Sequence, residues 1–377
     1  MKAIRTLLAT SLAAWFACAA HADINVGVIL PLTGPTSALG IASKNSIALW
    51  PASIAGQKLN IIMMDDATDP TQATKNARRM VTENQVDILL GSSSTPTANA
   101  VAAIAAETGT VQLTFAPIDV STAKSPWSYN LPQSTLVMSH ALVAHMKKNG
   151  VKTVGFLGYA DAFGELFLRD MKAKMAGTDL KFISEERFAR TDTSVTAQAL
   201  KVTAGNPDAI LIVASGSGAA MPHKALIERG YRGKIYQTHG AAARDLMRVG
   251  GKDVEGGYVV AGPGMVAEQL PAAHPSKAVA LAHVQAWEKV YGPNSRNTHA
   301  GHAYDASVVL QKIVPAALKS AQPGTKEFRG AIKAALENAG PIALFHGTVN
   351  YTATDHAGYT SDTGVIMRIT NGDWKLQ

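Results

Sequence analysis

The 377-residue sequence contains a single cysteine, Cys18, which lies close to the N-terminus. A lone cysteine excludes an intramolecular disulfide, and a chain processed beyond it has no thiol for catalysis or metal binding. Hydrophobic residues make up 47% of the sequence. We therefore expect an apolar core alone to hold the fold.

A basic run interleaved with aromatic residues is also absent. The net charge is +7, but the basic residues are scattered, and Arg78-Arg79 and Lys147-Lys148 are only pairs on amphipathic segments. Nucleic-acid binding surfaces normally cluster such residues. Nucleic acid is therefore not an expected partner.

The only conspicuous apolar run is N-terminal and too short for an ordinary membrane span. Lys2 and Arg5 precede the apolar stretch 7–19, and the small-x-small triplet 20–22 follows it. This order is typical of a secretion signal. We predict a signal peptide over residues 1–22, cleaved after Ala22, and a soluble exported protein; the residues before Cys18 do not favour a lipid anchor.

Known catalytic motifs are missing as well. The sequence has no Gly-x-Ser-x-Gly elbow at a strand end, no phosphate loop, no dinucleotide-binding glycine motif after the first strand and no zinc motif. The spacing of His299 and His302 is common by chance. We predict that the protein is not an enzyme and has no catalytic residues, metal or cofactor.

The chain does contain regular alternation of strand-like and helix-like segments from Asp23 onward. Mostly apolar strands in such an order indicate parallel sheets covered on both faces, the α/β class. The first unit has strands predicted at 24–30, 59–64, 86–90 and 111–115. A second unit repeats the pattern with strands at 154–158, 182–188, 209–214 and 234–237, followed by three helices and a β-rich tail.

The most informative segment is 86–97, in which an apolar strand ends at Gly91 and four hydroxyl residues precede an Ala-rich helix. Backbone N–H groups at a helix N-terminus, beside a strand's carboxyl end, can bind a carboxylate. Ser and Thr are also the preferred N-cap residues. The local pattern leaves both readings open.

Several blocks together resemble a known family, the type I periplasmic substrate-binding proteins of ABC importers, in their branched-chain amino acid (Leu/Ile/Val) binding group. The matching blocks are 29–35, 64–70, 86–95, 158–164, 345–349 and 355–358. Their order and spacing carry the resemblance, which extends from Asp23 essentially to the C-terminus.

The resemblance implies two doubly wound α/β lobes joined by three crossing strands, with lobe 1 over 23–134 and 263–345 and lobe 2 over 135–262 and 346–377. It implies a periplasmic monomer that closes over a small carboxylate and delivers it to a membrane permease. The alternative is a periplasmic sensing module that presents the ligand to a receptor or regulator.

The resemblance also places ligand-binding residues at the cleft. In lobe 1 these are the carboxylate-binding hydroxyl residues, the turn after the next strand and an apolar wall: Ser93, Ser94, Thr95, Ala116, Pro117, Ile118 and Leu39. In lobe 2 they are two aromatic residues, a hydroxyl after a strand and a histidine: Tyr159, Phe163, Ser215 and His239. Asp305 is expected to be a cap or hinge contact.

His239 departs from the family pattern, in which a glutamate near this position pairs with the α-ammonium of the ligand. A neutral histidine is no counter-ion, and a protonated one repels an ammonium group. Asp119 or Asp161 remains a possible replacement. The ligand is thus expected to be either a branched-chain type amino acid or an aromatic or other organic acid, with the acid gaining ground.

Overall fold

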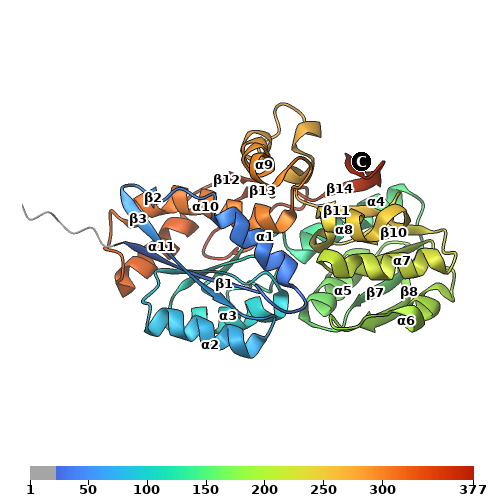
Figure 1. Cartoon of the computed structure of the whole chain (residues 1–377), viewed down its shortest axis with the longest axis horizontal. Coiled ribbons are helices and arrows are strands. Elements are labelled where there is room, and N and C mark those ends of the chain that lie inside the picture. Colours follow the sequence, from blue (N-terminus) through green and yellow to red (C-terminus); the bar gives the residue numbers. More distant parts are fainter. Residues whose placement is uncertain (1–22) are drawn as a thin grey trace, which may run out of the picture.

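The structure is a computed structural model that describes residues 23–377. The predicted signal peptide and its cleavage site after Ala22 lie outside the described residues. Within the described part, no helix combines the length and apolar character needed to cross a membrane. Two α/β lobes lie side by side, lobe 1 in blue, cyan and orange and lobe 2 in green and yellow (Figure 1).

Lobe 1 is built on a six-stranded sheet in the order β2-β3-β1-β4-β5-β6. All neighbouring pairs are parallel except the β2–β3 hairpin. The strands are β1 (Ile24–Leu30), β2 (Ser53–Ile54), β3 (Gln57–Asp65), β4 (Ile88–Gly91), β5 (Val111–Thr114) and β6 (Ser128–Asn130). The order reverses at β1 and β4, the kind of switch point beside which open α/β sheets bind ligands.

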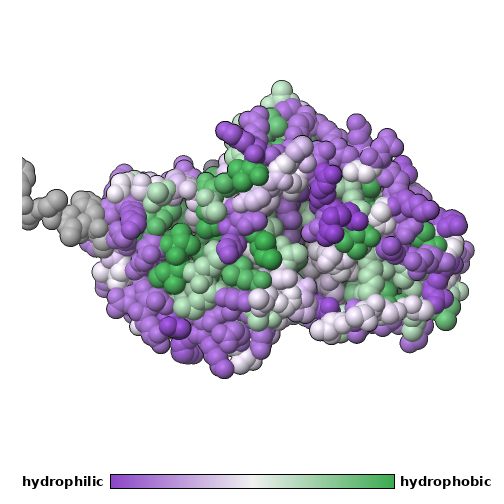
Figure 2. Space-filling model, viewed as in Figure 1, coloured by the Kyte–Doolittle hydropathy of each residue, from purple (hydrophilic) through white to green (hydrophobic). Residues whose placement is uncertain are grey.

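Helices cover both faces of this sheet, as the apolar strands predicted. One hydrophobic cluster joins the sheet to α10 and α11, and another joins it to α2 and α3. The lobe 1 helices are α1 (Ser37–Ile47), α2 (Pro70–Thr82), α3 (Thr95–Thr108), α10 (Thr298–Ala317) and α11 (Lys326–Glu337). On the face shown in Figure 2, hydrophobic residues gather in places over lobe 1 near α1, among largely hydrophilic surroundings.

Lobe 2 has a seven-stranded sheet in the order β15-β14-β11-β10-β9-β7-β8, in which β14 pairs antiparallel with both β11 and β15 and the other pairs are parallel. The strands are β7 (Thr153–Tyr159), β8 (Lys181–Phe188), β9 (Ala209–Val213), β10 (Lys234–Gln237), β11 (Tyr258–Ala261), β14 (Val365–Thr370) and β15 (Asp373–Leu376). One large apolar cluster unites this lobe.

Five helices and three short 3-10 turns belong to lobe 2. They are α4 (Thr135–Lys148), α5 (Ala162–Met175), α6 (Thr196–Thr203), η1 (Gly216–Ala219), α7 (Ala220–Glu228), η2 (His239–Ala241), α8 (Arg244–Gly250) and η3 (Gly251–Val254). Two further elements, η4 (Pro263–Gln269) and α9 (Lys277–Tyr291), lie above the junction of the lobes (Figure 1).

Aspartate caps fix the start of two helices next to the cleft. Asp69 accepts a hydrogen bond from the Thr71 N–H at 2.7 Å, and Pro70 fills the first helical position of α2. Asp161 accepts from the Phe163 N–H at 2.9 Å at the start of α5. A carboxylate at an N-cap also complements the helix dipole, so both helices begin where the sequence places their caps.

The third crossing lies later in the chain than the predicted boundary at residue 345. The hairpin of β12 (Ile342–Leu344) and β13 (Gly347–Val349) and the following Tyr351 and Tyr359 pack into the core of lobe 1. The chain enters the lobe 2 sheet only at β14. Conversely, η4 packs into the lobe 2 cluster rather than lobe 1. Three-dimensional packing sets both boundaries, and no local sequence signal marks them.

The crossing segments meet around His346. Gln133, in the first crossing, donates to the His346 carbonyl at 2.9 Å and to the Thr363 carbonyl at 2.7 Å. The Gly264 N–H, in the second, donates to the Phe345 carbonyl at 2.9 Å. Asp305, buried in the second turn of α10, accepts from the Phe345 N–H and lies 2.7 Å from His346 Nδ1. The expected hinge contact of Asp305 is confirmed, and it caps no helix.

Candidate functional site

A cavity lies between the two lobes, at the carboxyl ends of their strands. Its empty volume is about 280 Å³, part of which is open to solvent, and both lobes contribute to its wall. The lining residues are Leu39, Ser93, Ser94, Thr95, Phe115, Ala116, Pro117, Phe163, Arg190, Ser215, His239, Gly240 and His299.

The structure brings together all but two of the predicted ligand-binding residues. Tyr159 lies behind the wall, where its ring packs under the Arg190 guanidinium, 4.1 Å from ring centre to Cζ. Ile118 packs into a small cluster around Ala98 and Ala116 and faces a different hollow. Neither of these two residues lines the cavity, and ligand contact stays a prediction for all of the predicted residues.

The lobes approach each other closely at Leu39. A Cβ added at Gly216, which has a φ of +56°, would lie 3.0 Å from the Leu39 side chain of the opposite lobe. Only glycine adopts this backbone conformation without strain and leaves this space. The 214–218 turn of lobe 2 thus approaches lobe 1 closely, and Leu39 forms part of the apolar wall.

The four hydroxyl residues after β4 divide into one structural residue and three at the cavity. Ser92 donates to Asp66 at 2.6 Å and does not line the cavity. Thr95 donates its hydroxyl to the Pro117 carbonyl at 2.9 Å, which ties the two lobe 1 segments of the wall together. Ser93 and Ser94 lie beside Ser43 and Thr97, at 3.3 Å and 2.9 Å between hydroxyl oxygens.

Ser94 occupies the N-cap position of α3 but makes no side-chain capping hydrogen bond with the described residues. A helix start normally satisfies its first N–H groups through such a bond. Here the N-terminal end of α3 faces the cavity with its positive dipole and with the Ser94 hydroxyl, whose hydrogen-bond partner is the Thr97 hydroxyl rather than a backbone N–H. The capping function alone does not account for this segment, which favours the anion-binding reading.

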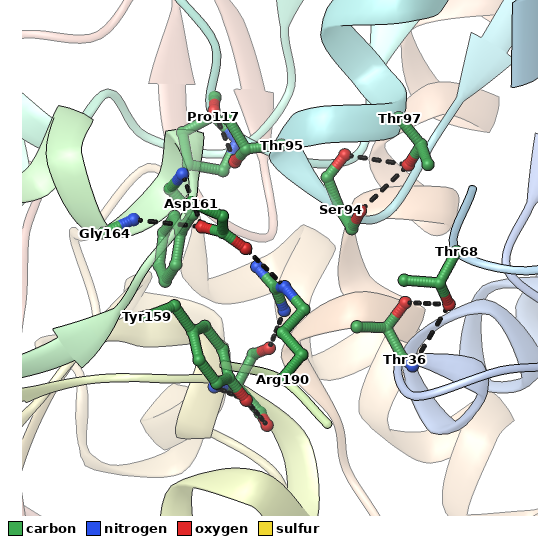
Figure 3. Close-up of polar contacts among 12 residues, drawn as sticks. Thr36, Thr68, Ser94, Thr95, Thr97, Pro117, Tyr159, Asp161, Gly164 and Arg190 are labelled. Carbon is green, nitrogen blue, oxygen red and sulfur yellow. Dashed lines mark hydrogen bonds and ion pairs between the residues drawn. The ribbon is translucent and has the colours of Figure 1, made fainter. Parts of the chain in front are cut away.

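Arg190 is the charged residue of the cavity wall, and sequence reasoning missed it. Its Nε donates to Asp161 at 2.6 Å, its Nη1 donates to Ser215 Oγ at 3.1 Å, and its plane covers Tyr159. Figure 3 shows Arg190 held between Asp161 and Tyr159 of lobe 2, with Ser94 and Thr97 of lobe 1 across from it. Three contacts thus fix a guanidinium at the cleft, and guanidinium is well suited to bind a carboxylate.

Two histidines supply a second polar part of the wall. His239 on η2 and His299 at the start of α10 are both buried, and Nδ1 of each has no hydrogen-bond partner among the described residues. Burial, reinforced by neighbouring histidines, holds the pKa of His239 well below its usual value and lowers the pKa of His299 to about 4. Both rings are therefore neutral near pH 7.

Behind them, further histidines connect the cavity wall to the hinge. His302 lies with its ring centre 6.0 Å from that of His239 and 4.1 Å from that of His346, on which it stacks. The sequence did not predict that His346 joins this group. Within residues 23–377, no set of three or more His, Cys, Asp or Glu side chains has an arrangement that could hold a metal ion.

The two aspartates considered as ammonium partners are already engaged. Asp161 accepts from Arg190 and from two backbone N–H groups of α5. Asp119 pairs with Lys124 at 3.0 Å and lies 3.8 Å from Arg169 across the lobe interface, in a separate hollow. Among the described residues, the cavity wall therefore contains no acidic side chain.

A two-lobed α/β molecule with a polar cavity at the lobe interface has the architecture of a ligand-binding protein. The model of the family described as periplasmic binding protein matches residues 23–373. The chain belongs to this family, whose members are extracytoplasmic and bind small molecules rather than catalyse reactions.

Individual relatives agree with this assignment. An extracellular ligand-binding receptor from Rhodopseudomonas palustris HaA2 is 44% identical, with a TM-score of 0.92 over 94% of this chain and 100% of that one. A Leu/Ile/Val-binding protein homolog from Brucella melitensis is 22% identical over 90% of both chains. A solute-binding protein of an ABC transporter from R. palustris BisB5, solved with 3,4-dihydroxybenzoic acid, is 21% identical over 93% of this chain and 95% of that one, with a TM-score of 0.78, and shares the fold.

The residues missed by sequence reasoning had only weak signals. Arg190 follows strand β8 by two positions, so its place at a strand's carboxyl end was available from the sequence. His299 was considered only as a metal ligand, and its contact with the Gly240 carbonyl joins segments 59 residues apart. Phe115 and Gly240 adjoin predicted site residues, and nothing in the pattern distinguished them.

Proposed function

We propose that the protein is the solute-binding component of an ABC importer, which captures a small carboxylate that carries no α-ammonium group and delivers it to a membrane permease. The observation that carries this proposal is the charge of the cavity wall: one guanidinium, one helix N-terminus, neutral histidines, hydroxyls and no free acid.

Hydrogen-bond donors suited to a carboxylate line the cavity on both lobes. Ser93, Ser94 and the N-terminal end of α3 approach from lobe 1, and Arg190 approaches from lobe 2. Arg190 already forms an ion pair with Asp161. An incoming carboxylate would therefore bind a guanidinium whose charge is partly neutralised by Asp161. Closure of the lobes then surrounds the carboxylate with donors from both sides, which supports the capture role.

An α-ammonium group would meet no acidic side chain among the described residues that line this cavity. Burial of an unpaired ammonium costs several kcal/mol, more than hydroxyl and carbonyl contacts return. The names of relatives do not decide between an amino acid and an amine-free acid, since one is a Leu/Ile/Val-binding homolog and another was solved with an aromatic acid. Phe163 and Leu39 give the cavity apolar walls that fit an aromatic or aliphatic body.

A thermal-shift screen of amino acids and of amine-free organic acids tests the proposal. A ligand that binds only the folded state raises the melting temperature, by an amount that grows with concentration over Kd. We expect at least one organic acid to raise it and the branched-chain amino acids to leave it unchanged. A panel in which only amino acids produce a shift would contradict the proposed ligand class.

A further inference from the structure

Asp161 holds two different groups, one with each oxygen of its carboxylate. Oδ1 accepts hydrogen bonds from the backbone N–H groups of Phe163 at 2.9 Å and Gly164 at 3.3 Å, which caps α5. Oδ2 accepts a hydrogen bond from Nε of Arg190 at 2.6 Å (Figure 3). A helix cap needs only one acceptor, which Ser, Thr or Asn also provides. The second oxygen therefore has a role that capping does not explain.

Two further contacts restrict the guanidinium of Arg190. Nη1 donates to Ser215 Oγ at 3.1 Å, and Cζ lies 4.1 Å from the centre of the Tyr159 ring. The side chain of Arg190 is only 12% exposed as a result. Asp161, Ser215 and Tyr159 all belong to lobe 2, at the carboxyl ends of neighbouring strands. The guanidinium is thus held by a single lobe, and none of the three contacts needs lobe 1 or a ligand.

One nitrogen of this guanidinium remains uncommitted. Nε and Nη1 each donate to a side chain of lobe 2, whereas Nη2 has no hydrogen-bond partner among residues 23–377. Arg190 lines the cavity, so its guanidinium combines a fixed position with a spare donor. Ordering a flexible arginine costs side-chain entropy, and affinity rises when the protein's own contacts have ordered it before the ligand binds.

We infer that Asp161 is a positioning residue of the proposed binding site, which holds the guanidinium of Arg190 in the orientation that receives the carboxylate of the ligand. Asp161 is not among the described residues that line the cavity, so it acts through Arg190 rather than by touching the ligand. This inference rests on the proposed function, since it assigns a role behind the same carboxylate site.

The variant Asp161→Asn separates the two contacts of this side chain. Its amide oxygen can still cap α5, because Asn is as good an N-cap residue as Asp. Its amide nitrogen then replaces Oδ2, so that two donors, this NH₂ group and the Nε–H of Arg190, face each other. The guanidinium must move away. We expect carboxylate binding to weaken about tenfold, even though the variant also removes a negative charge that repels the ligand.

Titration calorimetry with benzoate, 3-phenylpropanoate and 4-methylpentanoate measures this loss, for whichever of the three binds the wild-type protein most tightly. Asp69→Asn is the matched control. Asp69 caps α2 through the same kind of contact, forms no ion pair within residues 23–377 and does not line the cavity. It should retain the wild-type affinity within about twofold.

Nuclear magnetic resonance of the ligand-free protein reports on the guanidinium directly. The Nε–H proton of Arg190, assigned by its loss in Arg190→Met, should exchange slowly with water in the wild type and in Asp69→Asn, because it is held in a hydrogen bond. The same proton should exchange rapidly in Asp161→Asn. Rapid exchange in the wild type would overturn the inference, since the guanidinium would then not be ordered before binding.

A double-mutant cycle with Arg190→Met separates positioning from a merely structural role. If Asp161 acts through Arg190, adding Asp161→Asn to Arg190→Met should change the affinity by less than about twofold. A tenfold loss that persists in this background would overturn the inference, as would unchanged or tighter binding by Asp161→Asn alone, and either result leaves the carboxylate proposal standing. If none of the three acids binds the wild type, the proposed function fails first, and this inference fails with it.

Discussion

At the residue scale, the neighbouring serines after β4 have different roles. Ser92 donates to the buried Asp66, whose pKa burial raises to about 6, and Ser94 faces the cavity. Ser94→Ala should weaken ligand binding by roughly 1.5–3 kcal/mol, the value of a hydrogen bond to a charged group, without lowering the melting temperature. Ser92→Ala should do the reverse, because it removes the donor to Asp66. Calorimetry and thermal denaturation of both variants separate the roles, and identical behaviour would contradict the assignment.

Arg190 gives the second prediction at this scale. Arg190→Met should weaken carboxylate binding by about 10- to 100-fold, because the guanidinium is the only cation of the cavity wall that the described structure contains. Arg187→Met is the matched control: Arg187 lies on the neighbouring strand β8, pairs with Glu165 and does not line the cavity. Equal affinities of the two variants, measured by calorimetry, would remove Arg190 from the binding site.

At the element scale, two helical glycines differ in what surrounds them. A Cβ at Gly301 in α10 would lie 2.6 Å from the Phe345 ring and 2.8 Å from the His346 ring at the hinge, whereas one at Gly330 in α11 would meet nothing within 4 Å. Gly330→Ala should stabilise the protein by roughly 0.5–1 kcal/mol through helix propensity. Gly301→Ala should destabilise it, because the buried rings have no space to move. Urea denaturation of both variants checks the opposite signs, and stabilisation by both would show that the hinge is loosely packed.

Element by element, the sequence predicted the repeating architecture well and its irregular parts poorly. The strand 24–30 has the predicted bounds, because a mostly apolar run is a strong local signal. Strands β6 and β11 have only three and four residues and were missed. In the site, the sequence predicted most of the cavity residues that lie beside strand ends. It did not predict that His239, His299 and His346 lie close together, because this depends on packing between segments far apart in the chain.

At the scale of the whole molecule, buried neutral histidines make stability depend on pH. Burial lowers the pKa of His223 and His299 to about 4 and that of His283 to about 3, from an ordinary 6.5. Each contributes stability that is complete above pH 6.5 and is lost as the pH falls through its folded value, because the unfolded chain binds the proton more readily. Asp66, whose pKa is raised to about 6, acts in the opposite direction, but the histidines outnumber it.

We therefore expect the free energy of unfolding to decrease between about pH 6.5 and pH 4. His283 provides the test variant: it stacks on Tyr304 with ring centres 4.5 Å apart, and its Nε2 has no hydrogen-bond partner within residues 23–377. His283→Phe should flatten the decrease by removing one titrating group from an aromatic cluster. Urea denaturation across this range checks the slope, and a stability that rises on acidification would contradict the explanation.

The central claim is that this binding protein selects carboxylates without an α-ammonium group, and a matched pair of ligands tests it most directly. Leucine and 4-methylpentanoate share the same body and carboxylate and differ only in the amine. Titration calorimetry should show 4-methylpentanoate, or 3-phenylpropanoate in the corresponding pair with phenylalanine, binding at least about a hundredfold more tightly than the amino acid. Tighter binding of leucine or phenylalanine than of the amine-free acid would contradict the claim.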